Sequence, residues 1–508
     1  MSMKSISLAV IVFATLVRLC LLGGPVDVPS WRQADTGYMA LRMMDEWPPE
    51  MLHPKAPYRG LEDVKAAEFP IYPLMVSLGY KMLGRESLIL ARSVTLLFFL
   101  GAVLYLSLAT SRLFGPSVGW VCGAVFMILP IGIPYSRMIH PDFCVLFFAN
   151  GFFFHAVAFF QSRRVRDYAL AVLLCSGLFL MKAPYGFFYG FPLGLLVLEW
   201  NLSKSLRDLL LLGLMFVIPL ALGLWFNDYR IQQEAPHEES LVYPMKWTKE
   251  SLNERFFGTI SQRFDGQRWM WLLRRGVILV TTPVGAVLAA MGLFCAGTGW
   301  RDKRRWLLWF LAFGMLAYTL LVFPIVTSDH DYYSIPYMVF VSIAAASTLV
   351  WLVRGRRSIW VYPVLLLAIA VGSAYGIQRG PFLYSIPYFS RDWQRIEAGH
   401  GIRAFTEADD VVLSVTLGRS TGWSDPRILW LADRIGWSIQ FDQLTPEIVR
   451  QYQDAGATVA AILVAPGYDP GDLMAVFPER VEPRSHQLAG PDEQPLGRLI
   501  LVPLSPSP

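Results

Sequence analysis

Stretches of about 20 predominantly apolar residues recur along most of this chain, and they restrict its fold more than any other feature. A helix needs about 20 such residues to cross the hydrocarbon core of a bilayer. We therefore predict an α-helical polytopic membrane protein with eleven spanning helices. The expected spans are 4–22, 87–111, 117–136, 141–161, 168–181, 184–200, 208–226, 276–297, 305–326, 333–353 and 358–377.

Composition agrees with a membrane protein. Of the 508 residues, 54% are hydrophobic and only 16% are charged, whereas soluble domains carry about 25% charged residues. The net charge of +5 is attributed to lysine and arginine in cytoplasmic loops, so no nucleic-acid partner is expected. The five cysteines fall in or beside apolar runs without metal-ligand spacing, which favours small core residues over disulfides or zinc.

The segment 69–84 decides the predicted topology. It is apolar but short, and it contains Pro70, Pro73 and Lys81. If it does not cross, nearly every basic cluster between spans falls on the cytoplasmic side, and if it crosses, those clusters fall outside. We therefore predict a helix at the outer interface, with a cytoplasmic N-terminus and an extracytoplasmic C-terminus.

We predict two domains on this basis. Residues 1–377 would form the transmembrane core with large outer loops at 23–86 and 227–275, and residues 378–508 would form a small extracytoplasmic α/β domain. The first loop carries a further amphipathic segment, 33–47. Within the tail, strand-like runs alternate with helix-like runs, at 411–415, 426–433, 446–455 and 459–464.

Ionisable residues at or near membrane depth are energetically costly, which makes them candidates for function. Asp35 follows the first span, where it could act chemically or cap the next helix. Glu68 precedes Phe69-Pro70 and could equally be a carboxylate favoured by a helix dipole. His140 and Asp142 could ligate a cation, or Asp142 could cap the following span.

Two further clusters lie on the same predicted side. Lys182 could extend its side chain to the surface, yet it lies where the positive-inside rule disfavours lysine. Asp329, His330 and Asp331 precede Tyr332 and Tyr333. The tyrosines alone could be interfacial anchors, but the adjoining acids and histidine favour function. We expect these clusters, with Arg137, to form one site.

This set of side chains suits the transfer of a group from an anionic leaving group to a hydroxyl or amine. A carboxylate can act as general base, while cations and phenols stabilise charge that develops on a departing phosphate. Because no nucleotide pool exists outside the cytoplasm, we expect an activated donor that is attached to lipid.

In their order, these elements resemble the GT-C class of membrane glycosyltransferases over roughly residues 1–350, especially bacterial enzymes related to protein O-mannosyltransferases and to the lipid A aminoarabinose transferase. Glu68-Phe69-Pro70 departs from the Lys-Pro-Pro form common in relatives. The tail segment 430–437 also looks like one in bacterial members. The resemblance rests on Asp35, Glu68, Arg137, Pro141, Asp142, Lys182, Pro184, His330, Asp331, Tyr332, Tyr333 and Pro336.

The resemblance implies transfer of a sugar, with inversion, from a polyprenyl-phosphate carrier to a lipid, glycan or protein acceptor at a bacterial inner membrane, with the tail in the periplasm. Asp35 would be the general base. A divalent cation, with Asp142 and His330 as candidate ligands, stays open because metal dependence varies in this class. The acceptor side would use Glu68, Asp142, His330 and Asp331, and the donor phosphate would be bound by Arg137, Lys182, Tyr332 and Tyr333.

Two alternatives remain. A transporter or flippase for a polyprenyl-linked sugar would share the phosphate-binding cations without needing a general base, but transporters usually contain internal repeats, and none is evident. A polysaccharide polymerase or ligase that uses a lipid-diphosphate donor would be expected to carry more arginines on the outer face.

Overall fold

The computed structural model divides into two compact units, which are described separately. The first comprises the described parts of 1–24, 87–229 and 249–389, and the second those of 25–86, 230–248 and 390–508. The described residues are 2–27, 31–55, 68–199, 206–234, 249–296, 302–328, 330–356, 358–380, 388–417, 425–469, 476–477 and 482–504.

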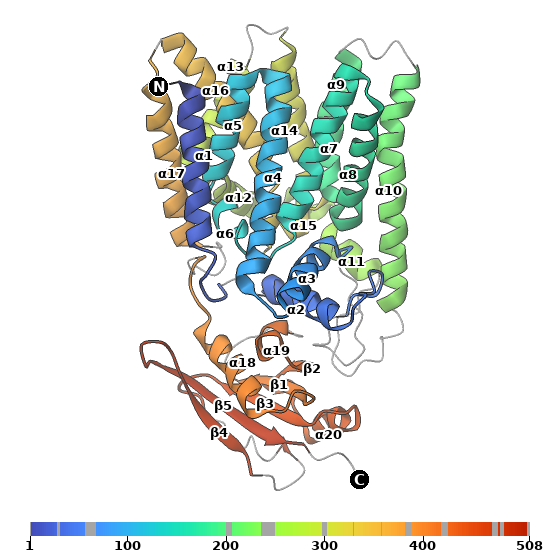
Figure 1. The fold of residues 1–508 in the computed structure, drawn as a ribbon, viewed down its shortest axis with the longest axis vertical. Helices are drawn as coiled ribbons and strands as arrows, with labels where there is room; N and C mark the ends of the chain where they lie inside the picture. The colour runs from blue at the N-terminus through green and yellow to red at the C-terminus, as the bar shows by residue number, and fades with distance from the viewer. Residues whose placement is uncertain are drawn as a thin grey trace. The chain divides into compact units, whose positions relative to one another are not determined.

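Long apolar helices run alongside one another in the first unit (Figure 1). Several begin at a capping side chain, as where the Ser87 hydroxyl accepts a hydrogen bond from the Leu90 amide and the Asp302 carboxylate accepts one from Arg304. The bounds are α1 Met3–Cys20, α4 Leu88–Phe114, α5 Pro116–Ile128, α6 Gly132–Tyr135, α7 Asp142–Ser162, α8 Val165–Lys182, α9 Pro184–Glu199, α10 Leu206–Glu234, α11 Lys249–Phe256, α12 Gly266–Arg275, α13 Pro283–Cys295, α14 Lys303–Leu321, α15 Phe323–Val326, α16 Tyr337–Arg356 and α17 Val361–Arg379.

Six helices in the described ranges are long and apolar enough to cross a membrane, or seven if a bent pair counts as one span. This confirms a helical polytopic membrane protein. The other predicted spans also contain helices, but α5 has 13 residues and α9 has 16, while α8 and α14 carry charges near their ends. The full count of eleven crossings therefore stays a prediction.

The predicted span 276–297 differs from the structure because it is broken. Residues 276–281 continue α12 as a π-helical turn, and the chain then bends by 98° into α13. Thr282 has φ 64° and ψ 158° at the break, and its hydroxyl accepts a hydrogen bond from the Gly285 amide at 3.1 Å. Pro283 can begin a helix but cannot continue one, so the sequence terminates one helix here and caps the next.

The helices of the first loop belong to the second unit. The α2 helix spans Trp31–Asp45 and packs on α3, Ile71–Leu83, through Met39, Met43 and Leu74. At 13 residues, α3 is about 20 Å long, which is too short to cross a hydrocarbon core of about 30 Å.

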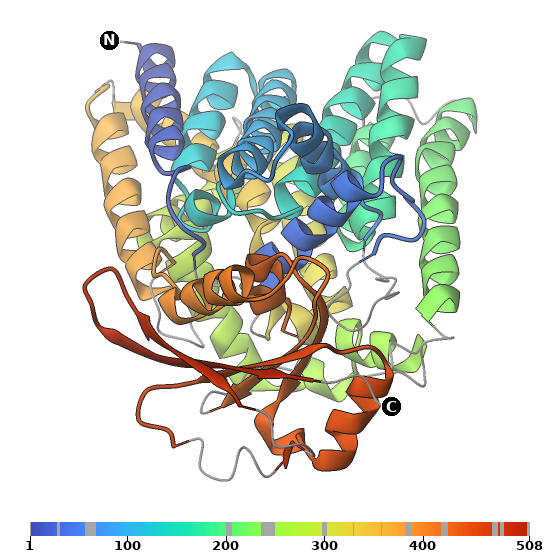
Figure 2. The same ribbon diagram turned by 60° about the horizontal axis from the view of Figure 1, so that its bottom comes forward.

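The tail contains a five-stranded mixed sheet of order β2-β1-β3-β5-β4 (Figure 2), which confirms a small C-terminal α/β domain. The β1 strand pairs parallel with β2 and β3, and β5 pairs antiparallel with β3 and β4. The bounds are α18 Trp393–Phe405, β1 Val411–Leu417, α19 Pro426–Ala432, β2 Ile435–Gln440, α20 Pro446–Asp454, β3 Val459–Val464, β4 Arg484–Ala489 and β5 Pro495–Pro503.

The central strands β1 and β3 are buried on both faces of the sheet. Leu413 and Ile462 share a core with Val449 and Tyr452 of α20. Intervening residues such as Val412 are also fully buried, and α18 and α19 pack against the strands. The domain is therefore a sheet covered by helices, as alternation between strands and helices predicts.

Glu86 supplies a pH-dependent contact in the second unit. Its Oε1 accepts a hydrogen bond from Trp430 Nε1 at 3.1 Å. Burial, followed by the negative charge of Asp433, raises the pKa of Glu86 to about 7. The pKa in an unfolded chain is about 4.3, so the destabilisation caused by ionising this group grows between about pH 4.3 and 7 and then levels off.

Replacing Glu86 by glutamine should remove this penalty while keeping a carbonyl acceptor for Trp430. We expect the Tm of the wild type to fall relative to that of Glu86→Gln as the pH is raised from 5 to 8. Differential scanning fluorimetry of the detergent-purified protein measures this, with the exposed Glu407→Gln as control. Parallel Tm curves for wild type and Glu86→Gln would contradict the assignment.

Candidate functional site

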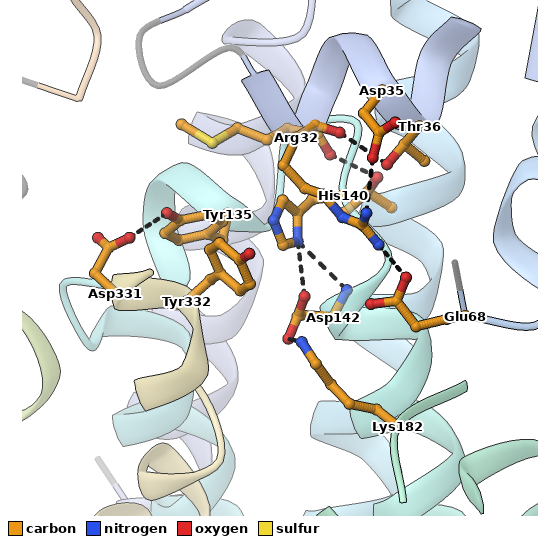
Figure 3. A network of polar contacts seen from close by, with 12 residues as sticks. Arg32, Asp35, Thr36, Glu68, Tyr135, His140, Asp142, Lys182, Asp331 and Tyr332 are labelled. Carbon is orange, nitrogen blue, oxygen red and sulfur yellow. Dashed lines mark hydrogen bonds and ion pairs between the residues drawn. The ribbon is translucent and has the colours of Figure 1, made fainter. Parts of the chain in front are cut away.

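Asp142 is the centre of a buried polar cluster in the first unit (Figure 3). Its Oδ1 accepts a 2.7 Å hydrogen bond from Lys182 Nζ and a short one from the Tyr185 hydroxyl. His140 Nδ1 lies 3.0 Å from its other oxygen, Oδ2. These partners come from the end of α8, the start of α9 and the turn before α7, so one carboxylate fixes the mutual position of three segments.

Lys182 lies among three tyrosine rings. Its Nζ is 4.0 Å from the ring centroid of Tyr333, 5.0 Å from that of Tyr332 and 5.2 Å from that of Tyr185. Such contacts stabilise an ammonium. Asp142 accepts from one of its three N–H donors. A buried lysine held in this way can bind an anion, because its charge is little screened by water.

From the sequence, no role was predicted for Tyr135, or for Tyr185, which lies in the same short segment as Lys182. Tyr185 joins the cluster through Asp142, and the Tyr135 ring packs edge-on against His140 at 5.0 Å. His140 also contacts the ring of Tyr332, at 4.7 Å. The sequence does carry a signal for Tyr185. Pro184 begins the helix that follows Lys182, so Tyr185 lies in its first turn, close to the lysine.

His330 contacts the rings of Tyr332 and Tyr333, at 5.6 and 6.4 Å between ring centroids, and has further polar neighbours. Its Nδ1 lies 3.1 Å from Ser328 Oγ, and its Nε2 lies 3.1 Å from Arg255 Nη2. Asp329 is outside the described residues. In the described part of the chain, no group of three or more histidine, cysteine, aspartate or glutamate side chains could hold a metal ion. A cation site at Asp142 and His330 stays a prediction.

Asp331 is bound by two tyrosines. Its Oδ1 accepts a 2.6 Å hydrogen bond from Tyr135, and its Oδ2 accepts a short one from Tyr388. Tyr388 also donates its amide to Ile377 at the end of α17. Asp331 thus ties the start of α16 to α6 and to the chain that follows α17, which gives this carboxylate a structural task.

We predict that Asp331→Asn lowers stability because an amide cannot accept both phenol hydrogen bonds at its two terminal atoms. Loss of one buried hydrogen bond costs about 1–3 kcal/mol, so the Tm measured by fluorimetry should fall. Tyr388→Phe removes the same contact from the other side, and the two losses should not add in the double variant. Additive losses would show that the two side chains act independently.

Arg137 is buried near the end of α1. Its Nη1 donates to the Leu21 carbonyl at 3.0 Å, and its guanidinium lies 4.9 Å from the centre of the Phe389 ring. These contacts hold the arginine in place, and its predicted role toward a phosphate stays a prediction.

A second cluster lies in the second unit. Arg32 Nη1 donates to Asp35 Oδ2 at 2.8 Å, and Arg32 Nη2 forms a short ion pair with Glu68 (Figure 3). Asp35 is 2% exposed. Because α2 begins at Trp31, Asp35 lies inside the helix, and its interpretation as an N-cap is wrong. Glu68 precedes α3 by three residues, so its helix-start interpretation remains.

The predicted site residues are divided between the two units. Asp35 and Glu68 share Arg32 in one unit, whereas Asp142 pairs with Lys182 in the other, together with Tyr332 and Tyr333. Convergence of all five sequence clusters on one site stays a prediction.

Comparison by sequence yields no relatives: no protein-family model and no curated protein matches the chain. Solved structures do match. ArnT from Cupriavidus metallidurans aligns over 98% of this chain and 97% of its own, with a TM-score of 0.57 at 13% identity.

Two further membrane enzymes share the arrangement. The oligosaccharyltransferase of Archaeoglobus fulgidus, solved with a tethered acceptor peptide, aligns over 90% of this chain and 68% of its own, with a TM-score of 0.52 at 10% identity. The mycobacterial arabinofuranosyltransferase AftD aligns over 98% of this chain but 41% of its own, with a TM-score of 0.55 at 13% identity. This chain therefore has the fold of the GT-C class of membrane glycosyltransferases.

Proposed function

We propose that this protein is a glycosyltransferase that moves a sugar from a polyprenyl-phosphate carrier to an extracytoplasmic acceptor, with inversion at the anomeric carbon. The observation that carries the proposal is Lys182, a buried ammonium surrounded by three tyrosines and paired with Asp142. An ammonium and phenol donors placed where water is scarce can stabilise the negative charge that develops on a leaving phosphate.

In the proposed reaction, the oxygen or nitrogen of the acceptor attacks the anomeric carbon and its proton passes to Asp35. The bond between that carbon and the phosphate oxygen breaks, and polyprenyl phosphate leaves with the electron pair. Lys182, Tyr332 and Tyr333 stabilise the departing phosphate, with Arg137 as a further cation. Glu68 keeps Arg32 beside Asp35, and His330 and Asp331 shape the acceptor side.

A solved structure with this fold supports a monophosphate carrier. The AglB enzyme of Archaeoglobus fulgidus was solved with a dolichol-phosphate and an inhibitory peptide, so one protein of this fold binds a polyprenyl-type monophosphate. We extend that carrier class to this chain, with a lipid, glycan or protein as acceptor.

The proposed setting is a bacterial inner membrane with eleven crossings. Helices α5, α8, α9 and α14, together with the bent pair of α12 and α13, would complete the set that begins with the six apolar spans. The N-terminus would be cytoplasmic and the tail periplasmic, because basic residues such as Arg163 and Arg304 then lie inside.

Purified protein tests this proposal directly. It is incubated with polyprenyl monophosphate carrying a hexose, a pentose or an amino sugar, together with a membrane lipid extract, and release of polyprenyl phosphate is followed by mass spectrometry. We expect consumption of at least one donor and a new glycosylated product. Movement of a donor across vesicle membranes without its consumption would instead support a flippase.

A further inference from the structure

The segment 430–434 at the end of α19 contacts α2 closely, and these contacts suggest a role for the tail. Both elements belong to the second unit. Tyr38 donates its hydroxyl to the Arg434 carbonyl at 2.5 Å, although 396 residues separate the two. Arg42 Nη2 donates to Asp433 Oδ1, also at 2.5 Å. These two bonds attach successive turns of α2 to the tail.

Gly37 permits the closest approach. A Cβ atom at this position would lie 2.9 Å from two carbons of the Trp430 ring, which is nearer than carbon atoms normally pack. Glycine inside a helix costs about 1 kcal/mol relative to alanine. Its presence at position 37 is explained by the Trp430 indole, which leaves no room for a Cβ atom. Trp430 is 2% exposed, and its N–H is held by Glu86.

The tail segment is itself rigidly held. Arg434 is buried and donates to Thr406 through Nε at 3.0 Å and through Nη2 at 2.9 Å, and to the Asp433 carbonyl at 3.0 Å. Asp433 has φ 53°, a left-handed conformation that ends α19 and turns its carboxylate toward Arg42.

The start of α2 is attached as well. The Arg427 guanidinium lies 5.6 Å from the centre of the Trp31 ring. Asp27, which precedes the helix, forms an ion pair with Arg391 of the tail, and Gln33 donates to the Asp27 carbonyl at 3.2 Å. Contacts with the tail therefore lie on both sides of Asp35 in the sequence.

We infer that the tail is a positioning clamp for α2, in which Trp430 and Asp433 act through the helix to fix the orientation of Asp35. A carboxylate that removes a proton must be placed to within a fraction of an ångström, and a displacement of about 1 Å can cost about 100-fold in rate. The inference rests on the proposed function for its catalytic consequence, whereas the clamp itself can be tested without substrate.

The first test is hydrogen exchange of the full-length protein in detergent. Gly37→Ala adds a methyl group against Trp430 and should speed exchange in residues 31–45 by at least about 10-fold. Trp430→Phe replaces the bicyclic indole by a single, smaller ring and so leaves room for the added methyl group. The double variant Gly37→Ala/Trp430→Phe should therefore exchange more slowly than Gly37→Ala. Gly213→Ala is the control, because a Cβ there meets nothing within 4 Å.

The second test uses whichever polyprenyl monophosphate sugar the wild type consumes. For Gly37→Ala, kcat per folded molecule should fall about 10- to 100-fold while KM for the donor changes less than about 3-fold, and the double variant should recover part of kcat. If Gly37→Ala does not fold, Asp433→Asn is used instead, since asparagine keeps the left-handed turn but gives up the charge.

These two tests distinguish failure of the clamp from failure of the proposed glycosyltransferase reaction. Unchanged exchange in 31–45 together with unchanged kcat in Gly37→Ala or Asp433→Asn would overturn the clamp. Faster exchange with an undiminished kcat would leave the tail as a stabilising contact and overturn its positioning role. Full activity of Asp35→Asn would overturn the general base, whatever the exchange data show.

Discussion

Replacing Asp35 by asparagine should lower kcat by about 10²–10⁴-fold, the range that general base catalysis contributes. Asparagine keeps the shape of the side chain and can still accept the hydrogen bond from Arg32, but it cannot take a proton from the acceptor. Release of polyprenyl phosphate per unit of folded protein measures the change.

The matched control is Glu46→Gln, which replaces an exposed carboxylate that lies directly after the same helix and pairs with Lys55. It should keep kcat close to the wild-type value. The size-exclusion profile should be unchanged for Asp35→Asn, and Tm should fall only slightly, because Arg32 keeps its ion pair with Glu68. Wild-type kcat in Asp35→Asn would exclude this residue as the base.

Replacing Lys182 by methionine should have two separable effects. The variant leaves the buried Asp142 carboxylate without its cation, and breaking such a pair costs about 3–5 kcal/mol. It also removes the ammonium that would bind the donor phosphate. Charge-assisted hydrogen bonds contribute about 1.5–3 kcal/mol, so we expect the Kd for a short-chain polyprenyl monophosphate to rise about 10- to 100-fold.

The double variant Lys182→Met/Asp142→Asn separates the two effects. With both charges removed, stability should recover toward the wild type, and asparagine can still accept from Tyr185. Phosphate binding should remain weak. Tm reports the first effect and titration calorimetry the second, with the exposed Lys81→Met as control. Recovery of binding in the double variant would show that Lys182 does not contact the phosphate.

The parts of the fold that follow from a local pattern were predictable from the sequence. Long apolar runs predicted the spans such as α4 and α7, and short strand-like apolar runs predicted β1 and β3. The sequence did not indicate β4. The residues of this strand are mostly polar and exposed, so they form no apolar run that would mark a strand. The break at Thr282 lies within a continuous apolar run, where hydropathy cannot locate a bend.

The candidate site was predictable by residue type but not by pairing. Sequence reasoning found Asp142 and Lys182 because charges are rare beside apolar spans. It could not foresee that they bind each other, or that Asp331 is held by Tyr135 and Tyr388. Such pairings depend on how distant helices pack, and tyrosines carry no charge to mark them in an apolar sequence.

The hydrogen bond between Tyr38 and Arg434 also has a consequence for biogenesis. The ribosome makes about 5–20 residues per second, so the 396 residues between these partners take about 20–80 s to synthesise. Throughout that interval α2 lacks the part of its packing surface that the tail supplies, although it can already pack on α3. The α2 helix and its Asp35 reach their native surroundings only after the tail has been synthesised, so a nascent chain interrupted before residue 430 would lack the contacts that hold this helix.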